Sequence, residues 1–246
     1  MAENKKQDLE KDIEDFAEEM KENKKEEKVM EKETMKKETK KVELNVGTFS
    51  KVQKYNGGKV VARYPYANRD GIIDFEIWRM EGAKEPFYAM HIGKDGQELP
   101  GMGKASPIIY NLPKVLEAKE NRKTIFIVEG ESKADVLNEL GYVATTAPFS
   151  GTDKWNERYN KYVKYANVLI LADNDDKSRE FAENTYSEVS EYANNVGIIE
   201  LVSLYPQLKK GGDIEDLRNI VNDDEYLKET LDSIINDLLS ENKEEK

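Results

Sequence analysis

The sequence contains no cysteine and a single histidine. The lack of cysteine excludes disulfide bonds, thiolate nucleophiles and cysteine-ligated zinc. With a single histidine, we do not expect a zinc site of another kind. No apolar run approaches the roughly 20 residues that a membrane-spanning helix needs, and the charged amino terminus lacks the apolar centre of a signal peptide. We therefore expect a cytoplasmic protein that does not act at a membrane.

An excess of positive charge is also lacking. The chain has 50 acidic and 38 basic residues and a formal net charge of −12. This balance argues against a protein that simply coats nucleic acid, because phosphate binding rests on lysine and arginine. It leaves open an enzyme with a local basic groove around an acidic metal site. No GxxxxGK[ST] stretch is present, so the sequence offers no phosphate-binding loop of an ATPase.

The first 41 residues differ in composition from the remainder. Lysine and glutamate dominate there and apolar residues are sparse, although Leu9, Ile13, Phe16 and Met20 fall at helical spacing. Such a segment has little to bury, which predicts a charged arm that is helical or disordered. A solvated arm is favoured over a helix for a specific partner, because charge runs are usually solvated.

Aromatic and β-branched residues return in segment 42–120, together with turn signals. Residues 60–66 and 72–79 read as a hairpin and 87–92 as a third strand, which predicts a small antiparallel α+β subdomain. Several aromatic residues there have two readings, base stacking or the more frequent role in the core: Trp78, Phe87, Tyr88 and Tyr110. This segment also leans basic, which is compatible with a nucleic-acid face or with a solvated sheet surface.

From residue 124 onward, apolar strands alternate with helical patterns, which predicts parallel βαβ units. The expected strands are 124–128, 142–146, 168–172 and 198–204. The expected helices are 112–119, 133–140, 153–165, 177–195 (closed by Gly197), 214–221 and 225–239. The fold class predicted is therefore α/β, with a parallel sheet flanked by helices and preceded by the antiparallel subdomain. The predicted boundaries are 1–41, 42–120, 121–221 and 222–246.

Acidic residues follow two of these strands at the point where each strand ends. Glu129 and Gly130 follow the first strand, and Asp173 and Asp175 follow the third. Ligands of open parallel sheets bind beyond the carboxyl ends of the strands. Carboxylate oxygens are the ligands that Mg²⁺ prefers. The spacing therefore predicts a Mg²⁺ or Mn²⁺ site at this edge.

The stretches VEGESKADVLNELG and LADNDDKSREFA resemble the Toprim domain, which bacterial-type primases, topoisomerases and several small nucleases share. The resemblance extends from about residue 64 to residue 217 and is strongest to the primase-like Toprim proteins of phages and mobile elements. It implies that Glu129 is the general acid or base and that Asp173 and Asp175 are metal ligands. The same resemblance implies further site residues: Glu129 and Asp176 at the metal, and Gly130, Lys133 and Arg179 at the substrate.

Lys133 departs from the family pattern. Primase-like members usually carry an aspartate here, four residues after the glutamate, whereas type IA topoisomerases can carry a serine-lysine-alanine sequence. Two readings stay open for Lys133. It contacts a phosphate, or it pairs with Asp173 or Asp175 in the place of the metal and leaves a binding domain without activity.

Three functions follow from the resemblance. The leading one is a Mg²⁺-dependent primase-like protein that binds single-stranded DNA and nucleotides in phage or mobile-element replication, with a replicative helicase or another replication protein as a possible partner. A Toprim nuclease is the enzymatic alternative, since the same carboxylates support hydrolysis. The third is a non-catalytic module that binds nucleic acid or protein and regulates replication or host defence.

Overall fold

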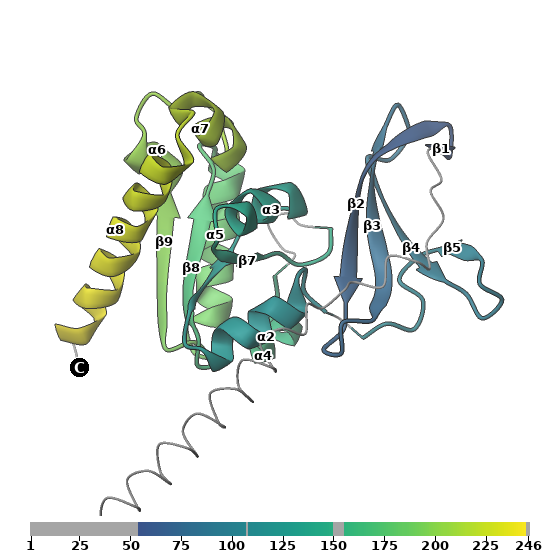
Figure 1. Cartoon of the computed structure of the whole chain (residues 1–246), viewed down its shortest axis with the longest axis horizontal. Helices are drawn as coiled ribbons and strands as arrows, with labels where there is room; N and C mark the ends of the chain where they lie inside the picture. The colour runs from purple at the N-terminus through teal and green to yellow at the C-terminus, as the bar shows by residue number, and fades with distance from the viewer. Residues whose placement is uncertain (1–53, 107, 150–154, 245–246) are drawn as a thin grey trace, which may run out of the picture. The chain divides into compact units, whose positions relative to one another are not determined.

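The computed structural model describes residues 54–106, 108–149 and 155–244, and of residues 238–244 it describes the backbone alone (Figure 1). The predicted arm, 1–41, lies outside the described residues. Within the described ranges no helix is long and apolar enough to cross a membrane. A five-stranded antiparallel sheet and a four-stranded parallel sheet with helices on both faces make up the fold, which confirms the predicted α/β class.

The antiparallel sheet is a meander in which each strand pairs with the next one along the chain. Its first hairpin turns at Asn56 and Gly57, whose φ values are 44° and 80°. Two successive positive φ angles match the twist of a tight hairpin and favour this Asn-Gly pair. The strands are β1 (Lys54–Tyr55), β2 (Gly58–Ala67), β3 (Ile73–Glu81), β4 (Phe87–Ile92) and β5 (Glu98–Pro100).

Each face of this sheet carries buried side chains. One face contributes Tyr64, Tyr66 and Phe75 to the main core, and the other carries a small cluster around Trp78. The Trp78 indole N–H donates to the Glu76 carboxylate at 2.7 Å, and the Arg63 guanidinium lies 4.2 Å from the indole ring centroid. With 1% of its surface exposed, Trp78 belongs to the core rather than to a base-stacking surface.

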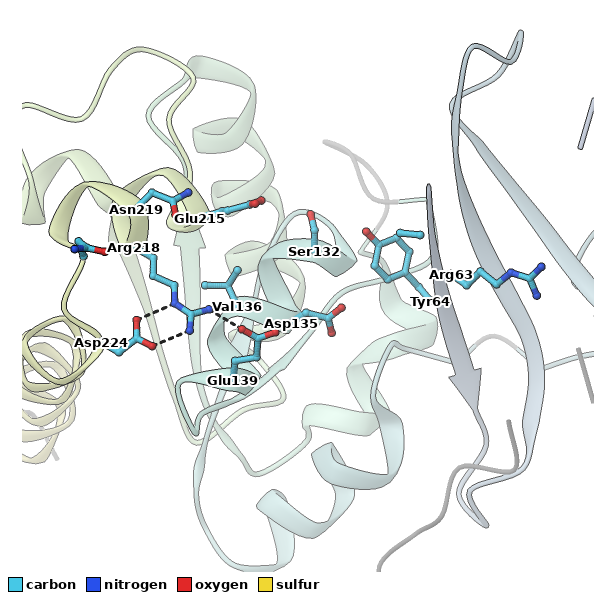
Figure 2. Close-up of a pocket in the computed structure, with 12 residues that line it drawn as sticks. Arg63, Tyr64, Ser132, Asp135, Val136, Glu139, Glu215, Arg218, Asn219 and Asp224 are labelled. Atoms are coloured by element: carbon cyan, nitrogen blue, oxygen red, sulfur yellow. Dashed lines mark hydrogen bonds and ion pairs between the residues drawn. The ribbon is translucent and has the colours of Figure 1, made fainter. Parts of the chain in front are cut away.

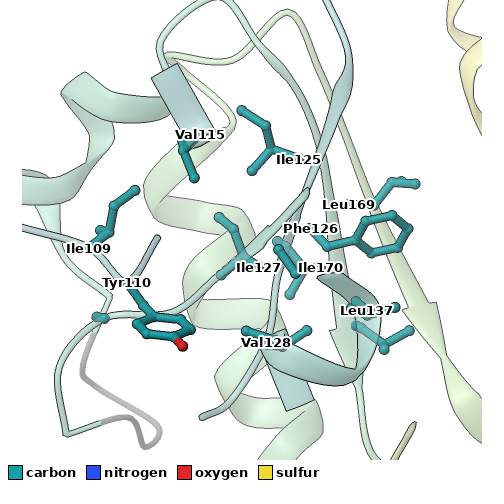
Figure 3. Close-up of a cluster of buried hydrophobic side chains, with 14 of the residues drawn as sticks. Ile109, Tyr110, Val115, Ile125, Phe126, Ile127, Val128, Leu137, Leu169 and Ile170 are labelled. Carbon is teal, nitrogen blue, oxygen red and sulfur yellow. The ribbon is translucent and has the colours of Figure 1, made fainter. Parts of the chain in front are cut away.

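The parallel sheet has the strand order β7-β6-β8-β9, so β6 and β8 are its central strands. Alternate side chains of β6 leave opposite faces: Ile125 lies toward Val115 of α2, while Phe126 lies toward Leu169 of the neighbouring strand (Figure 3). Burial on both faces explains the continuous apolar runs of these strands. The strands are β6 (Thr124–Ile127), β7 (Val143–Thr145), β8 (Asn167–Ala172) and β9 (Asn195–Glu200).

Six of the seven described helices form two groups by their mutual contacts. In the first group α4 touches both α2 and α5, and in the second α7 touches both α3 and α8. One hydrophobic core contains residues from both sheets and therefore crosses the predicted boundary at residue 120; the domain boundaries stay predictions. The helices are α2 (Leu112–Glu120), α3 (Glu131–Glu139), α4 (Glu157–Val163), α5 (Asp176–Val189), α6 (Leu201–Leu204), α7 (Ile214–Val221) and α8 (Asp224–Glu244).

The prediction for residues 177–204 was wrong in three details. Helix α5 ends at Val189, and Gly197 lies inside β9 instead of closing the helix. The backbone N–H of Asn194 donates to the Ala166 carbonyl at 2.8 Å, which holds the chain beside the start of β8 and lets β9 begin at residue 195. The end of the expected strand, 201–204, forms the short helix α6.

Candidate functional site

The chain leaves β6 through Glu129 and Gly130. Gly130 has φ 111° and ψ 152°, a conformation that is essentially restricted to glycine. Its N–H donates to the Thr146 hydroxyl at 3.2 Å, which ties the turn to the end of β7. Helix α3 begins at the next residue, Glu131. The glycine therefore allows a direct passage from the strand into α3, with Glu129 at the bend.

The chain leaves β8 through Asp173, Asn174 and Asp175. Asp173 is 6% exposed, and its backbone N–H donates to the Ser178 hydroxyl at 2.9 Å. The Asp175 carboxylate accepts the N–H of Ser178 at 2.9 Å and thereby caps α5. Aspartate is a favoured helix cap because its oxygen satisfies an N–H that lacks a partner within the helix. Asp175 thus has a structural role in addition to its predicted role at a metal.

Asn174 joins this turn to the turn before α7. Its backbone N–H donates to the Gly212 carbonyl at 2.9 Å, and its carbonyl accepts from Gly211 N–H at 2.7 Å. Its side-chain amide donates to the Leu208 carbonyl at 2.8 Å. These bonds bring Asp213, the cap of α7, into the neighbourhood of Asp173. The central asparagine of the Asp-Asn-Asp motif is therefore a structural link between two acidic turns.

The carboxyl ends of β6 and β8 meet at an ion pair between the Lys133 ammonium and the Asp173 carboxylate. Burial is the main reason that the pKa of Asp173 is raised to about 6. The Lys133 ammonium opposes that rise, whereas the negative charges of Asp213 and Glu129 add to it. Glu129, Lys133, Asp173 and Asp213 form a charged group at the strand ends, which we call the acidic crevice. The structure brings together three acidic groups and one lysine there.

The acidic crevice offers carboxylate oxygens, the donor type that Mg²⁺ and Mn²⁺ prefer. In the part of the chain that the structure describes, no three histidine or acidic side chains are arranged to hold a metal ion. The Asp173 carboxylate is paired with the Lys133 ammonium, and the Asp175 carboxylate accepts the hydrogen bond that caps α5. The donor chemistry therefore fits a divalent ion, but Lys133 competes with it for Asp173.

Asp176 and Arg179 form a second charged group on α5. The Arg179 guanidinium contacts the Asp176 carboxylate at 2.8 Å and the Glu200 carboxylate, at the end of β9, at 3.1 Å. Asp176 is well exposed, with 86% of its side-chain surface accessible. Their predicted roles, Asp176 at a metal and Arg179 at a phosphate, stay predictions. In this arrangement the Arg179 guanidinium is already paired with two carboxylates.

A cleft of about 800 Å³ lies along another side of α3 (Figure 2). Ser132, Asp135 and Glu139 line it from α3, at the i, i+3 and i+7 positions of one helical face. Arg218 of α7 crosses part of it and contacts the carboxylates of Glu139 at 2.6 Å and Asp224 at 2.7 Å. Lys133 is absent from the residues that line it. This cleft is therefore distinct from the acidic crevice.

The sequence did not single out Glu131, a buried acidic residue two positions after Glu129. Glu131 is 4% exposed, and the Tyr66 hydroxyl of β2 donates to its carboxylate at 2.8 Å. Burial raises the pKa of Glu131, and the hydrogen bond from Tyr66 opposes that rise. The only signal in the sequence is a second glutamate two residues after Glu129, and its burial depends on a strand 65 residues away.

Comparisons with known proteins identify similar structures but no similar sequences. No family model matches the chain, and no curated protein matches it. A DNA primase domain from Pseudomonas aeruginosa has a TM-score of 0.50 and 17% identity, over 68% of this chain and 48% of that one. The Escherichia coli primase catalytic core has a TM-score of 0.48 and 14% identity, over 68% and 49%.

The RNA polymerase domain of Mycobacterium tuberculosis primase DnaG has a TM-score of 0.45 and 14% identity, over 85% of this chain and 65% of that one. The chain thus spans about half the length of the first two structures. At 17% identity, the match to the Pseudomonas aeruginosa domain is a similarity of fold. The fold of this chain, a parallel sheet flanked by helices beside an antiparallel sheet, is similar to that of a DNA primase domain.

Proposed function

We propose that this chain is a primase-like Toprim protein that acts on nucleic acid at the acidic crevice. One observation carries the proposal: Glu129, Lys133 and Asp173 meet at the carboxyl ends of two adjacent parallel strands, in a fold similar to a DNA primase domain. Ligands of parallel sheets bind at that edge. The VEGESK and LADNDD stretches, which resemble Toprim motifs, supply these residues.

The Mg²⁺-dependent form of the proposal depends on Lys133. Glu129, Asp173 and Asp175, with Asp176 beside them, would hold the ion, which would neutralise charge on a phosphate during phosphoryl or nucleotidyl transfer. For this, Lys133 has to leave Asp173. A nucleotide phosphate offers the ammonium a new anionic partner. The Lys133 ammonium would then pair with that phosphate instead of the Asp173 carboxylate. Glu129 would then be the general acid or base.

The non-catalytic alternative rests on the same ion pair. If Lys133 keeps Asp173, its ammonium remains in the place of the ion and the crevice has no activity. The protein then binds nucleic acid through other surfaces, among which the antiparallel sheet carries the exposed basic residues Lys59, Arg69, Arg79 and Lys84. Single-stranded DNA and nucleotides are the ligands proposed in both forms. A helicase partner, a phage or mobile-element origin and a cytoplasmic location rest on the sequence.

One assay separates these functions. Wild-type protein is incubated with a labelled single strand, nucleoside triphosphates and Mg²⁺ or Mn²⁺, and the strand is scored for binding, extension and shortening. Extension that disappears in Glu129→Gln supports the primase-like form, and shortening that disappears supports the nuclease. Binding without product supports the non-catalytic module. A wild-type protein that neither binds nor changes the strand contradicts the proposed function.

A further inference from the structure

A small cavity lies between the antiparallel sheet and the start of α3. It has a volume of about 260 Å³ and is lined by Ile77, Glu85, Pro86, Phe87, Glu131 and Phe149. Pockets for drug-sized ligands measure roughly 300 to 1,000 Å³. This cavity is therefore sized for one flat ring system rather than for a complete nucleotide. None of the residues of the acidic crevice lines it, although Glu131 follows Glu129 by two residues in the chain.

Two of its lining residues are aromatic rings that remain accessible. Phe87 of β4 is 41% exposed and Phe149, in the loop after β7, is 36% exposed. Exposed aromatic rings of single-strand-binding proteins stack on bases. Phe149 also has φ 55°, an unusual backbone conformation for a bulky residue. The exposed rings thus supply a stacking surface.

The polar group of the cavity is the carboxylate of Glu131. Tyr66, which is fully buried, donates its hydroxyl to one carboxylate oxygen at 2.8 Å and so holds the group in position. An ionised carboxylate only accepts hydrogen bonds, and each oxygen accepts more than one. A ligand for this position must therefore be flat and must present N–H donors on its edge. Guanine presents two adjacent donors, N1–H and the N2 amino group, whereas thymine presents carbonyl oxygens on either side of a single N–H.

A basic residue stands next to the cavity. Arg79 pairs with Phe87 across strands β3 and β4, and it lies two residues from Ile77 on the same face of β3. Arg79 is exposed, and its guanidinium is close enough to the Tyr64 hydroxyl to form a hydrogen bond. A guanidinium at this place can contact the backbone phosphate of a nucleotide whose base enters the cavity.

We propose that this cavity binds one unpaired guanine of a single strand, with Phe87 and Phe149 against the faces of the base, Glu131 accepting its N–H donors and Arg79 contacting its phosphate. This inference rests on the proposed function, because it requires the chain to bind nucleic acid. It adds to the proposed function a preference for guanine. The cavity that recognises the base contains Glu131, two residues after Glu129 of the acidic crevice.

The test is fluorescence anisotropy with labelled oligothymidylate strands that carry a single central guanine, adenine or cytosine. Wild-type protein binds the guanine strand about tenfold more tightly than the all-thymine strand. Glu131→Gln, which can still accept the Tyr66 hydrogen bond, removes that preference. Phe87→Ala weakens binding of the guanine strand about tenfold. Arg79→Ala weakens all strands by a similar factor, because phosphate contacts carry no base information.

Glu117→Gln is the matched control, since it removes one exposed carboxylate from α2 without touching the cavity. It retains the guanine preference. Equal binding of all strands by wild type, or a preference that survives in Glu131→Gln, overturns the inference and leaves the proposed function standing. If no strand binds to wild type, the proposed function fails, and the guanine site fails with it.

Discussion

The ammonium of Lys133 donates to the carboxylate of Asp173 and so joins the first turn of α3 to the end of β8. Both side chains are largely shielded, with 16% and 7% of their surfaces exposed. A shielded carboxylate costs free energy unless a cation or hydrogen bonds offset the lost hydration. Asp173 has further negative charge near it from Glu129 and Asp213. Lys133 is therefore the cation that offsets the charge of Asp173 in the part of the chain that the structure describes.

Replacement of Lys133 by methionine should destabilise the metal-free protein. Removing one partner of a shielded ion pair costs about 3 kcal/mol, and the loss should be larger at pH 8 than at pH 5. Without the ammonium the pKa of Asp173 rises further, so the unfavourable ionised form is populated at pH 8 and much less at pH 5. Urea unfolding at the two pH values, with Lys123→Met as an exposed control, measures the effect. Equal losses at both pH values would contradict the role of Asp173.

The buried Glu131 predicts a second dependence on pH. Burial raises the pKa of this carboxyl in the folded protein above its ordinary value of 4.5. The folded state then binds more protons than the unfolded state between these two pKa values, so the free energy of unfolding falls as pH rises through them. Glu131→Gln keeps an acceptor for Tyr66 and removes the charge. We expect the variant to have a higher urea midpoint than wild type at pH 7 and no advantage at pH 4. A lower midpoint at pH 7 would refute this account of Glu131.

Gly130 should not tolerate a side chain. At φ 111° and ψ 152° an alanine is strained, and we expect Gly130→Ala to lower the free energy of unfolding by about 1 to 3 kcal/mol. The turn also sets the position of Glu129, so binding of nucleic acid at the acidic crevice should weaken as well. Gly197→Ala, in β9 and outside the set of positive-φ glycines, is the comparison. Urea unfolding curves of both variants give the two losses of free energy of unfolding. Equal and small losses would show that the turn at Gly130 adjusts to a side chain, which contradicts the prediction.

Local sequence patterns predicted most helices and strands, because these elements depend on residues that are close together in the chain. The strand 87–92 matches β4 at both ends, and helix 214–221 matches α7, where Asp213 forms a capping box with Asp216. The failure at β9 was different in kind. Gly197 resembles a helix stop, yet its place is decided by pairing with Leu169 of β8. Strand pairing is a tertiary contact that no local pattern reports.

The candidate site could be predicted only as far as its strand ends. Apolar runs that stop at Glu129 and Asp173 indicate which residues reach one edge of the sheet. The sequence did not decide which group Lys133 contacts. A substrate phosphate and the carboxylates of Asp173 and Asp175 were all candidate partners. The Asn174 link to Gly212 and the bond from Tyr66 to Glu131 join segments at least 38 residues apart, and their spacing carries no periodic signal.

Binding of Mn²⁺ is the measurement that tests the central claim most directly, namely that Lys133 and a divalent ion compete for Asp173. Electron paramagnetic resonance of free Mn²⁺ gives the affinity of wild type, Lys133→Ala and Lys133→Ala combined with Asp173→Asn, all without nucleotide. The account predicts weak binding by wild type, tighter binding by at least about tenfold in Lys133→Ala, because the competing ammonium is gone, and loss of that gain in the double variant. Unchanged Mn²⁺ affinity in Lys133→Ala, or a gain that persists without the Asp173 carboxylate, would contradict it.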